Sequence, residues 1–245
     1  MSSRKLKRIT SELKELEKSV DILEQSGIYF HYDESNINIL YAMLIGPSNT
    51  PYENGFYFFK FEYPDNYPMQ PPVAKYCTQG SIINYTDSKF HHIRFNPNLY
   101  VCGKVCLSML NTWSGPGWVP TNTITNVLVA LQALVLNEQP LQNEPGFENS
   151  SLEILNKYRN IISYSNIQIA VIEMLKKQPI GFEVFKEKME KIFLKNIDWY
   201  KNNILEFKDE QYKKMDAGVY SMKIETNIKK VEDELNELEK SLQPS

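Results

Sequence analysis

The fold of this chain is organised around residues 95–120, which read Phe-Asn-Pro-Asn-Leu-Tyr-Val-Cys-Gly-Lys-Val-Cys-Leu-Ser-Met-Leu-Asn-Thr-Trp-Ser-Gly-Pro-Gly-Trp-Val-Pro. Within them, Asn96-Pro97-Asn98 predicts a turn, because proline fixes φ and short asparagine side chains hydrogen-bond back onto the main chain. Gly103 predicts a second tight bend, followed by the short apolar run that contains Cys106. We therefore expect the thiol of Cys106 near a bend rather than deep in a regular element, exposed to a carbonyl carried by another molecule, as acyl transfer requires.

Two cysteines of this segment are candidate nucleophiles. Cys102 and Cys106 lie four residues apart, and their immediate surroundings leave the choice between them nearly even. Lys104 mildly favours the thiolate form of Cys106 through its charge. Asn98 offers an amide N–H donor eight residues before Cys106, the kind of group that stabilises a developing oxyanion. Taken alone, the segment indicates acyl-transfer chemistry only weakly.

The spacing of Asn98, Gly103 and Cys106, followed by a tryptophan and a proline before a predicted helix, resembles the catalytic segment of the ubiquitin-conjugating enzymes. That family usually has His-Pro-Asn where this chain has Asn-Pro-Asn. The departure points to the Z-type branch of the family. Gly-Pro-Gly-Trp at 115–118 and Asn-Glu-Pro-Gly-Phe at 143–147 also resemble this branch.

The resemblance covers residues 3–147, continues more loosely beyond them, and implies an α+β ubiquitin-conjugating fold. In this fold an N-terminal helix and a four-stranded antiparallel sheet precede the catalytic segment, and further helices follow it. We assign residues 1–180 to the ubiquitin-conjugating core domain and residues 181–245 to a helical C-terminal extension.

The resemblance also implies an acyltransferase that works through a cysteine thioester. Cys106 is expected to accept ubiquitin or a ubiquitin-like modifier from an activating enzyme. It then passes the modifier to a lysine of a protein substrate, usually with a ubiquitin ligase. Because the incoming modifier is already a thioester, transfer to the thiol is nearly isoenergetic and requires mainly positioning and oxyanion stabilisation. ATP is used by the activating enzyme, so we expect no cofactor on this chain.

The functional residues of the family map onto matching positions here. Cys106 is expected to carry the thioester, while Asn98 binds the oxyanion and braces the loop. Pro97 and Gly103 are expected to support the catalytic loop, with Gly103 letting the chain turn close to the thioester. The resemblance places partner surfaces at Arg4, Lys5 and Arg8 for the activating enzyme and at Pro68, Met69, Gln70, Trp118, Val119 and Pro120 for the ligase.

Activation of the acceptor lysine is the step that matches the family least. Family members commonly have an acidic or hydroxyl residue on the loop after the helix, where it helps an amine of pKa about 10.4 to lose its proton. That position falls at Gln142, with Asn143 and Glu144 beside it. Glutamine is a poor proton acceptor, so Glu144 is the nearest acid, and the turn at Pro145-Gly146 would have to swing it toward the thioester. The alternative is that Glu144 only solvates the loop or caps a later helix.

Composition and charge bound the class of protein. The chain has 245 residues, 42% hydrophobic and 23% charged, which is long enough for one sizeable domain and an extension. Its net charge of −3, with both signs interspersed, does not indicate a nucleic-acid or membrane partner. Three cysteines and three histidines make neither a disulfide framework nor a zinc set, so we expect no metal. A start without a long apolar run, and no stretch of membrane-spanning length, favour a cytoplasmic or nuclear protein.

The periodicity of apolar residues predicts the remaining elements. We expect helices at 4–24, 123–136, 152–177, 182–207 and 221–242, strands at 28–32, 37–45, 55–63 and 73–76, and a polar, irregular insertion at 77–93. Pro140 is expected to stop the helix that begins at Thr123. The apolar stripe of the last helix is too short for a coiled coil, so we expect it to dock within a monomer.

Two other functions fit parts of the pattern. A non-enzymatic binding module of the same fold would lack the reactive cysteine, so the presence of Cys106 argues against it. A thiol hydrolase of ubiquitin adducts would need His31, His91 or His92 beside Cys106. We assign no role to the adjacent His91 and His92, because neighbouring histidines without a third nearby are more often solvated loop residues than metal ligands.

Overall fold

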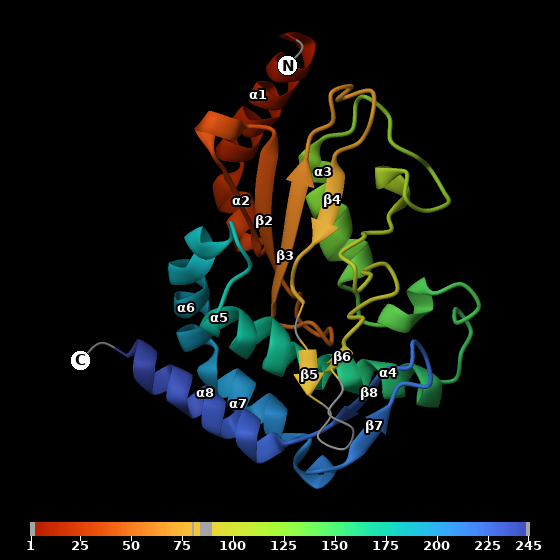
Figure 1. The fold of residues 1–245 in the computed structure, drawn as a ribbon, viewed down its shortest axis with the longest axis vertical. Coiled ribbons are helices and arrows are strands. Elements are labelled where there is room, and N and C mark those ends of the chain that lie inside the picture. The colour runs from red at the N-terminus through yellow and green to blue at the C-terminus, as the bar shows by residue number, and fades with distance from the viewer. Residues whose placement is uncertain (1–2, 80, 84–89, 244–245) are drawn as a thin grey trace.

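The predicted four-stranded antiparallel sheet is present in the computed structural model, which describes residues 3–79, 81–83 and 90–243 (Figure 1). Its strands follow one another in chain order: β1 (Ile28–Tyr32), β2 (Ile39–Ile45), β3 (Phe56–Glu62) and β4 (Val73–Tyr76). The register pairs Ile28 with Leu44 and Ile45 with Phe56. β1 and β4 have the predicted bounds, and β1 and β4 form the two edges of the sheet.

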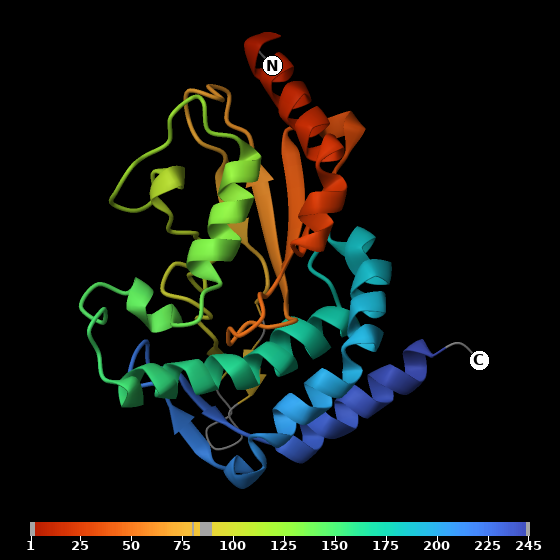
Figure 2. The ribbon, with the colours of Figure 1, turned by 180° about the vertical axis from the view of Figure 1, so that it is seen from behind.

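The centre of the sheet is buried on both faces. Four consecutive residues of β3, at positions 56–59, are fully buried, and successive side chains of a strand point to opposite faces. Seen from behind, α1 (Ser3–Lys18) and α3 (Ile124–Ala130) lie over one face of the sheet (Figure 2). The ring of Phe58 also packs against Phe182 and Phe185, with ring centroids 4.8 and 6.3 Å away. Residues of the C-terminal part therefore belong to the same hydrophobic core as the sheet.

The prediction of one helix over residues 4–24 is wrong, because the chain forms α1 (Ser3–Lys18) and α2 (Val20–Gln25). Ser19 between them leaves the helical conformation, with φ −101° and ψ 8°. The buried apolar residues of the two helices are Ile9, Leu13, Leu16 and Leu23. Leu6, although it continues the apolar pattern from which the helix at 4–24 is predicted, is exposed, since the first turns of α1 extend past the end of the sheet (Figure 1).

The insertion at 77–93 is not irregular throughout. β5 (Ser81–Ile83) pairs antiparallel with β6 (Phe90–His92), with Ser81 opposite His92. Isoleucine and phenylalanine have high strand propensity, and they lie within these short strands among polar neighbours. The prediction of an irregular segment is therefore wrong for residues 81–83 and 90–92.

The helix predicted at 123–136 is present as α3 (Ile124–Ala130), which continues as the π-helical turn η3 (Leu131–Val135). Thr123 and Asn126 form a reciprocal capping box at its start. The helix ends before Pro140, which instead begins the 3-10 helix η4 (Pro140–Asn143), so this proline does not stop it. Leu134 is exposed rather than buried, because the wider π turn breaks the spacing of three and four that predicted its burial.

The helix predicted at 152–177 is confirmed. It runs without interruption through α4 (Leu152–Ser165), the π-helical stretch η5 (Asn166–Glu173) and α5 (Met174–Lys176). The prediction of one helix over 182–207 is wrong, because the chain forms η6 (Glu183–Phe185), α6 (Lys186–Lys195) and α7 (Ile197–Leu205). Asn196 separates the last two helices, and its Nδ2 donates to the carbonyl of Ile192 at 2.9 Å. Such local side-chain bonds compete with the helical backbone pattern.

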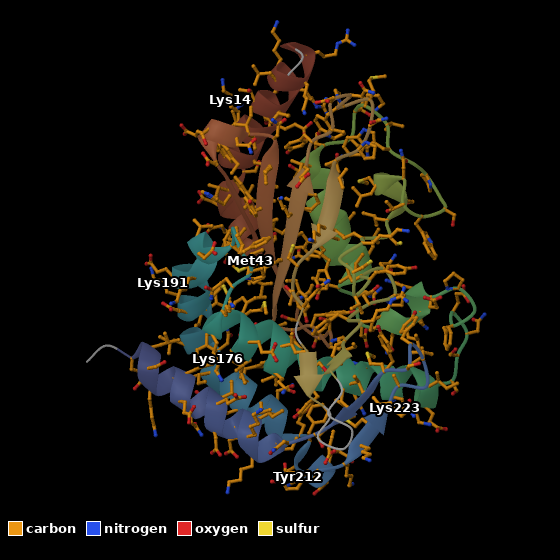
Figure 3. The ribbon with its side chains drawn as sticks, in the orientation of Figure 1. Lys14, Met43, Lys176, Lys191, Tyr212 and Lys223 are labelled. Carbon is orange, nitrogen blue, oxygen red and sulfur yellow. The ribbon has the colours of Figure 1, made fainter. Side chains whose placement is uncertain are left out.

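The last predicted helix begins seven residues later than expected, as α8 (Ile228–Leu242). Before it, β7 (Lys214–Asp216) and β8 (Lys223–Glu225) form a hairpin, so Ile224 belongs to a strand rather than to the helix. Val231 and Leu235 of α8 are fully buried, and Lys176 of the long helix pairs with Glu234 at 2.8 Å (Figure 3). The expected docking of this helix on its own chain is confirmed.

Short 3-10 turns complete the described elements: η1 (Glu34–Asn36), η2 (Ser108–Leu110) and η7 (Lys208–Glu210). No helix in the described part of the chain has the length and hydropathy that crossing a membrane requires.

Candidate active site

The candidate active site begins with a hydrogen-bonded turn at Asn96. The N–H of Leu99 donates to the carbonyl of Asn96 at 2.9 Å. The N–H of Asn98 donates to Oδ1 of Asn96 at 2.8 Å. The turn expected at Asn96-Pro97-Asn98 is therefore confirmed, and Asn96 closes it through both its main chain and its side chain.

Gly103 forms the second expected bend and joins the segment to the sheet. Its φ is +89°, and its N–H donates to the carbonyl of Tyr100 at 2.8 Å. A Cβ at this position would approach the carbonyl oxygen of Tyr76 to 3.0 Å, so the site favours glycine in both conformation and space. The N–H of Tyr76 donates to the carbonyl of Gly103, and Lys75 forms a β-bridge with Lys104. The segment is thus attached to β4 at the edge of the sheet.

Asn98 and Cys106 are joined by two hydrogen bonds. The N–H of Cys106 donates to the carbonyl of Asn98 at 2.8 Å. Nδ2 of Asn98 donates to the carbonyl of Cys106 at 2.7 Å. In this conformation the amide of Asn98 braces the loop around the thiol, as expected for one of its two predicted roles.

The three cysteines differ in exposure. Cys106 is only 1% exposed, whereas Cys102 is exposed and Cys77 is half-buried. The thiol of Cys106 lies beside a bend, as predicted, but the expected exposure is wrong for this conformation. Burial raises the pKa of the Cys77 thiol, which disfavours its thiolate.

Asn96, where the family usually has histidine, ties the turn at Asn96-Pro97-Asn98, here called the catalytic turn, to the end of η3. Its Nδ2 donates to the hydroxyl of Tyr52 at 3.0 Å and to the carbonyl of Val135 at 2.7 Å. Its Oδ1 also accepts from Nδ2 of Asn143 at 3.4 Å. The hydroxyl of Tyr52 donates to the carbonyl of Phe95 at 2.7 Å, and burial raises the pKa of this phenol, so it stays protonated. Asn96 therefore links three segments at a fully buried position.

The three candidate acceptor-activating residues, at the end of η4 and just after it, are directed differently. The side chain of Gln142 is exposed and donates to the carbonyl of Glu148 at 3.3 Å. Asn143 donates to Asn96 and to the carbonyl of Leu134 at 3.0 Å. Glu144 is half-buried and accepts a hydrogen bond from the hydroxyl of Tyr220. Asn143 is thus part of the catalytic-turn network, while Glu144 is held by the C-terminal part of the chain.

Sequence reasoning did not place three of these residues in the site: Tyr52, Asn96 and Tyr220. The departure from His-Pro-Asn marked Asn96 as unusual without revealing its contacts. Tyr220 lies 76 residues from Glu144, and no local pattern connects the two.

Comparison with protein-family models identifies the family of this chain. Residues 8–160 match the family model described as ubiquitin-conjugating enzyme, which is well over half of the chain. The chain belongs to the ubiquitin-conjugating enzyme family. The resemblance and the α+β ubiquitin-conjugating fold expected from the sequence are therefore confirmed.

Individual relatives agree with the family assignment. The chain is 38% identical over 175 residues to ubiquitin-conjugating enzyme E2 Z of Xenopus tropicalis, covering 71% of this chain and 53% of that protein. It is 39% identical over 175 residues to ubiquitin-conjugating enzyme E2 Z of Homo sapiens, covering 71% of this chain and 47% of that protein. The chain thus spans about half the length of the curated relatives it matches. Among solved structures, the E2 domain of a Toxoplasma gondii ubiquitin conjugating enzyme is 23% identical, with a TM-score of 0.46, and covers 65% of this chain and 99% of its own.

The two loops expected to meet a ligase lie together in this ubiquitin-conjugating fold. The indole N–H of Trp118 donates to the carbonyl of Pro68 at 2.7 Å, and both residues are buried. Met69 and Val119 are 63% and 52% exposed beside them. Gln70 and Pro120 are exposed as well. The structure therefore divides the six predicted residues into two anchors and four surface positions.

The surface expected for the activating enzyme is only partly exposed. Lys5 is 3% exposed, and its Nζ donates to the carbonyl of Tyr63 at 2.8 Å and lies 3.5 Å from Asp65. The prediction of a surface position is wrong for Lys5, because its ammonium anchors α1 to the loop after β3. Arg8 is half-buried and donates to the carbonyl of Asn122 at 2.7 Å, whereas Arg4 is exposed.

The position of His31 does not support a cysteine–histidine hydrolase that uses this residue. His31 lies on β1, at the opposite edge of the sheet from the strand that carries the catalytic segment. The side chains of His91 and His92 lie outside the described part of the structure. Among the residues that are described, no group of three or more histidine, cysteine or acidic side chains is arranged to hold a metal ion.

Proposed function

We propose that this chain is an acyltransferase that accepts ubiquitin or a ubiquitin-like modifier as a thioester on Cys106 and transfers it to a lysine amine. The observation that carries the proposal is the pair of hydrogen bonds between Asn98 and Cys106 in a chain of this family. These bonds fix the main chain on both sides of a thiol that lies beside a bend.

The first step is exchange of one thioester for another. The thiolate of Cys106 attacks the carbonyl carbon of the modifier's thioester on the activating enzyme, a new C–S bond forms, and the activating enzyme's thiolate leaves. Two thioesters have similar energies, so the step needs positioning more than chemical activation. We assign the exposed Arg4 and the half-buried Arg8, near the start of α1, to contact with the activating enzyme.

The second step forms an isopeptide bond. The neutral lysine amine attacks the same carbonyl carbon, the C–N bond forms, the C–S bond breaks, and Cys106 leaves as a thiolate. The amine must lose a proton, and we assign Glu144, which directly follows η4, to accept it. A ligase is expected to dock on the exposed Met69, Gln70, Val119 and Pro120, which flank the bond between Trp118 and Pro68.

The division into a core domain at 1–180 and a C-terminal extension at 181–245, the monomeric state and the cytoplasmic or nuclear location remain predictions. The identity of the modifier is part of the same test, because each candidate modifier can be offered with each activating enzyme.

The experiment is a charging assay with ATP, an activating enzyme and a tagged modifier. We expect an adduct on this chain that disappears when a thiol reductant is added. Cys106→Ser should trap a reductant-resistant oxyester, whereas Cys102→Ala and Cys77→Ala should still charge. Absence of any adduct would favour a binding module of the same fold. Loss of charging in folded Cys102→Ala would move the assignment to Cys102.

A further inference from the structure

We infer that Tyr220, on the turn between β7 and β8, is a positioning residue for the acceptor step: its hydroxyl holds Glu144 while its ring holds Arg94 beside the catalytic turn. The inference rests on the proposed function and adds a role for the C-terminal extension in it. One side chain of the extension contacts both the loop that carries the candidate acid and the segment that leads to Cys106.

The first contact is with the carboxylate of Glu144. The hydroxyl of Tyr220 donates to Oε2 of Glu144, and both residues are half-buried. Burial and this hydrogen bond raise the pKa of Tyr220, so the phenol keeps its proton and remains a donor at neutral pH. Among the described residues, no hydrogen bond reaches Oε1 of Glu144. A carboxylate held through one oxygen and open at the other can accept a proton in a defined direction.

The second contact is with the guanidinium of Arg94. Its Cζ lies 3.9 Å from the ring centroid of Tyr100 and 4.1 Å from that of Tyr220. Nη2 of Arg94 also donates to the carbonyl of Pro97 at 2.5 Å. Tyr100 and Pro97 both belong to the catalytic segment. The ring of Tyr220 therefore closes one side of a stack whose other side is the segment that contains Cys106.

The residue before Glu144 connects its loop to the turn before Cys106 by hydrogen bonds. Asn143, its neighbour in the chain, donates to Asn96 at 3.4 Å. Asn96 accepts from the N–H of Asn98, and Asn98 is joined to Cys106 by two hydrogen bonds. The loop that Tyr220 holds is thus connected to the catalytic turn, and a shift of Glu144 changes its position relative to Cys106.

The backbone at Tyr220 supports a role for its side chain. Tyr220 and Ser221 have φ values of +55° and +52°, in the left-handed region that favours glycine and asparagine. The N–H of Met222 donates to the carbonyl of Val219 at 3.1 Å, which closes a two-residue turn around them. A tyrosine at such a position is unfavourable for the turn alone. Its ring packs edge-on against Tyr158 of α4 at 6.1 Å, which sets its direction.

The test is Tyr220→Phe, which keeps the ring over Arg94 and removes only the hydroxyl. We expect charging of Cys106 to be unchanged and discharge to free lysine at pH 7 to slow by roughly fivefold to tenfold, part of the effect of a general base. The defect should shrink toward pH 10, where the amine loses its proton unaided. The groups around the bond that also carry or take up charge are Arg94, Tyr100 and Tyr158. Tyr212→Phe, at an exposed tyrosine of the same extension (Figure 3), is the matched control and should discharge normally.

A double-mutant cycle separates positioning from general stability. If Tyr220 acts through Glu144, then adding Tyr220→Phe to Glu144→Gln should slow discharge no further. Three results would each overturn the inference: unchanged discharge in Tyr220→Phe, multiplicative effects of the two substitutions, or a parallel loss of melting temperature and charging. In each case, charging of the wild type would still uphold the proposed function. Failure of the wild type to charge with any modifier would overturn both.

Discussion

The indole N–H of Trp118 donates to the carbonyl of Pro68 across 2.7 Å and joins two loops that are 50 residues apart in the chain. The bond lies beneath Met69 and Val119, whose apolar side chains are largely exposed. A surface whose framework is already hydrogen-bonded loses less conformational freedom when a partner binds. We therefore expect this pair to matter to ligase-dependent transfer although neither residue is well exposed.

Trp118→Phe removes the donor and leaves the carbonyl of Pro68 without this partner. We expect the protein to lose about 1 kcal/mol of unfolding free energy, a fall in melting temperature of roughly 2–4 °C for a chain of this size. Ligase-stimulated discharge should fall more than unstimulated discharge. Met69→Ala, at an exposed position, should reduce ligase stimulation without changing the melting temperature. Normal stimulation in both variants would contradict the assignment of this surface.

Asn98→Ala tests the two predicted roles of that amide. Because Nδ2 already donates to the carbonyl of Cys106, we expect its loss to lower the melting temperature and the rate of charging together. If Asn98 also binds the oxyanion, discharge to lysine should slow by roughly a hundredfold or more. Asn160→Ala, at an exposed residue of α4, serves as the control. Unchanged discharge would remove Asn98 from the mechanism.

Glu144→Gln tests whether the loop after α3 assists the acceptor. We expect charging to be intact and discharge to free lysine to be slow near pH 7, because the amine then lacks a proton acceptor. The defect should diminish as pH rises toward the lysine pKa of about 10.4. Rates measured from pH 6.5 to 10, beside Glu138→Gln as an exposed control, check this. A defect independent of pH, or none, would mean that the substrate or a ligase supplies the proton acceptor.

The partly buried carboxyl of Glu173 is expected to make the free energy of unfolding depend on pH. Burial, and next the charge of Glu234, raise the pKa of this carboxyl from 4.5 to about 7, against the opposing effect of Lys230 and Lys176. Between these two values the folded chain binds more protons than the unfolded chain, so the free energy of unfolding falls as pH rises through this window and stays lower above it.

Glu173→Gln removes the free-energy cost of ionising this carboxyl in the folded protein. Since the side chain is partly solvated, we expect a gain of only about 1 kcal/mol at pH 8. The gain should be much smaller at pH 5, where the carboxyl is largely protonated in the folded state. Thermal melts at the two values, with Glu237→Gln on the exposed face of α8 as the control, measure the difference. Equal effects at pH 5 and pH 8 would show that the charge of Glu173 is not the cause.

The sheet could be predicted from sequence because its determinants are local. Aromatic and β-branched runs alternate with proline- and asparagine-rich turns, so β1 and β4 have the expected bounds. Helix breaks could not be predicted in the same way. The apolar spacing continues across Ser19 and Asn196, and these polar residues interrupt the backbone without interrupting the pattern.

The same distinction between local and long-range determinants applies to the candidate active site. Asn98, Gly103 and Cys106 lie within one short segment, and the local residue types Asn96-Pro97-Asn98 and Gly103 were enough to predict both bends. Tertiary contacts were not predictable from that spacing. The ammonium of Lys5 donates to a carbonyl 58 residues away in the chain, and Glu144 accepts a hydrogen bond from Tyr220, 76 residues away.

The difference in exposure between Cys102 and Cys106 has a practical consequence for chemical labelling. Maleimides and iodoacetamides modify the thiols that they meet first, and Cys102 is exposed whereas Cys106 is buried in the resting conformation. A fluorophore, a spin label or a covalent fragment intended for Cys106 will therefore accumulate four residues away, on Cys102. Replacing both Cys102 and the half-buried Cys77 with serine before any such experiment leaves Cys106 as the target, and the rate of its labelling then reports how often this buried thiol becomes accessible.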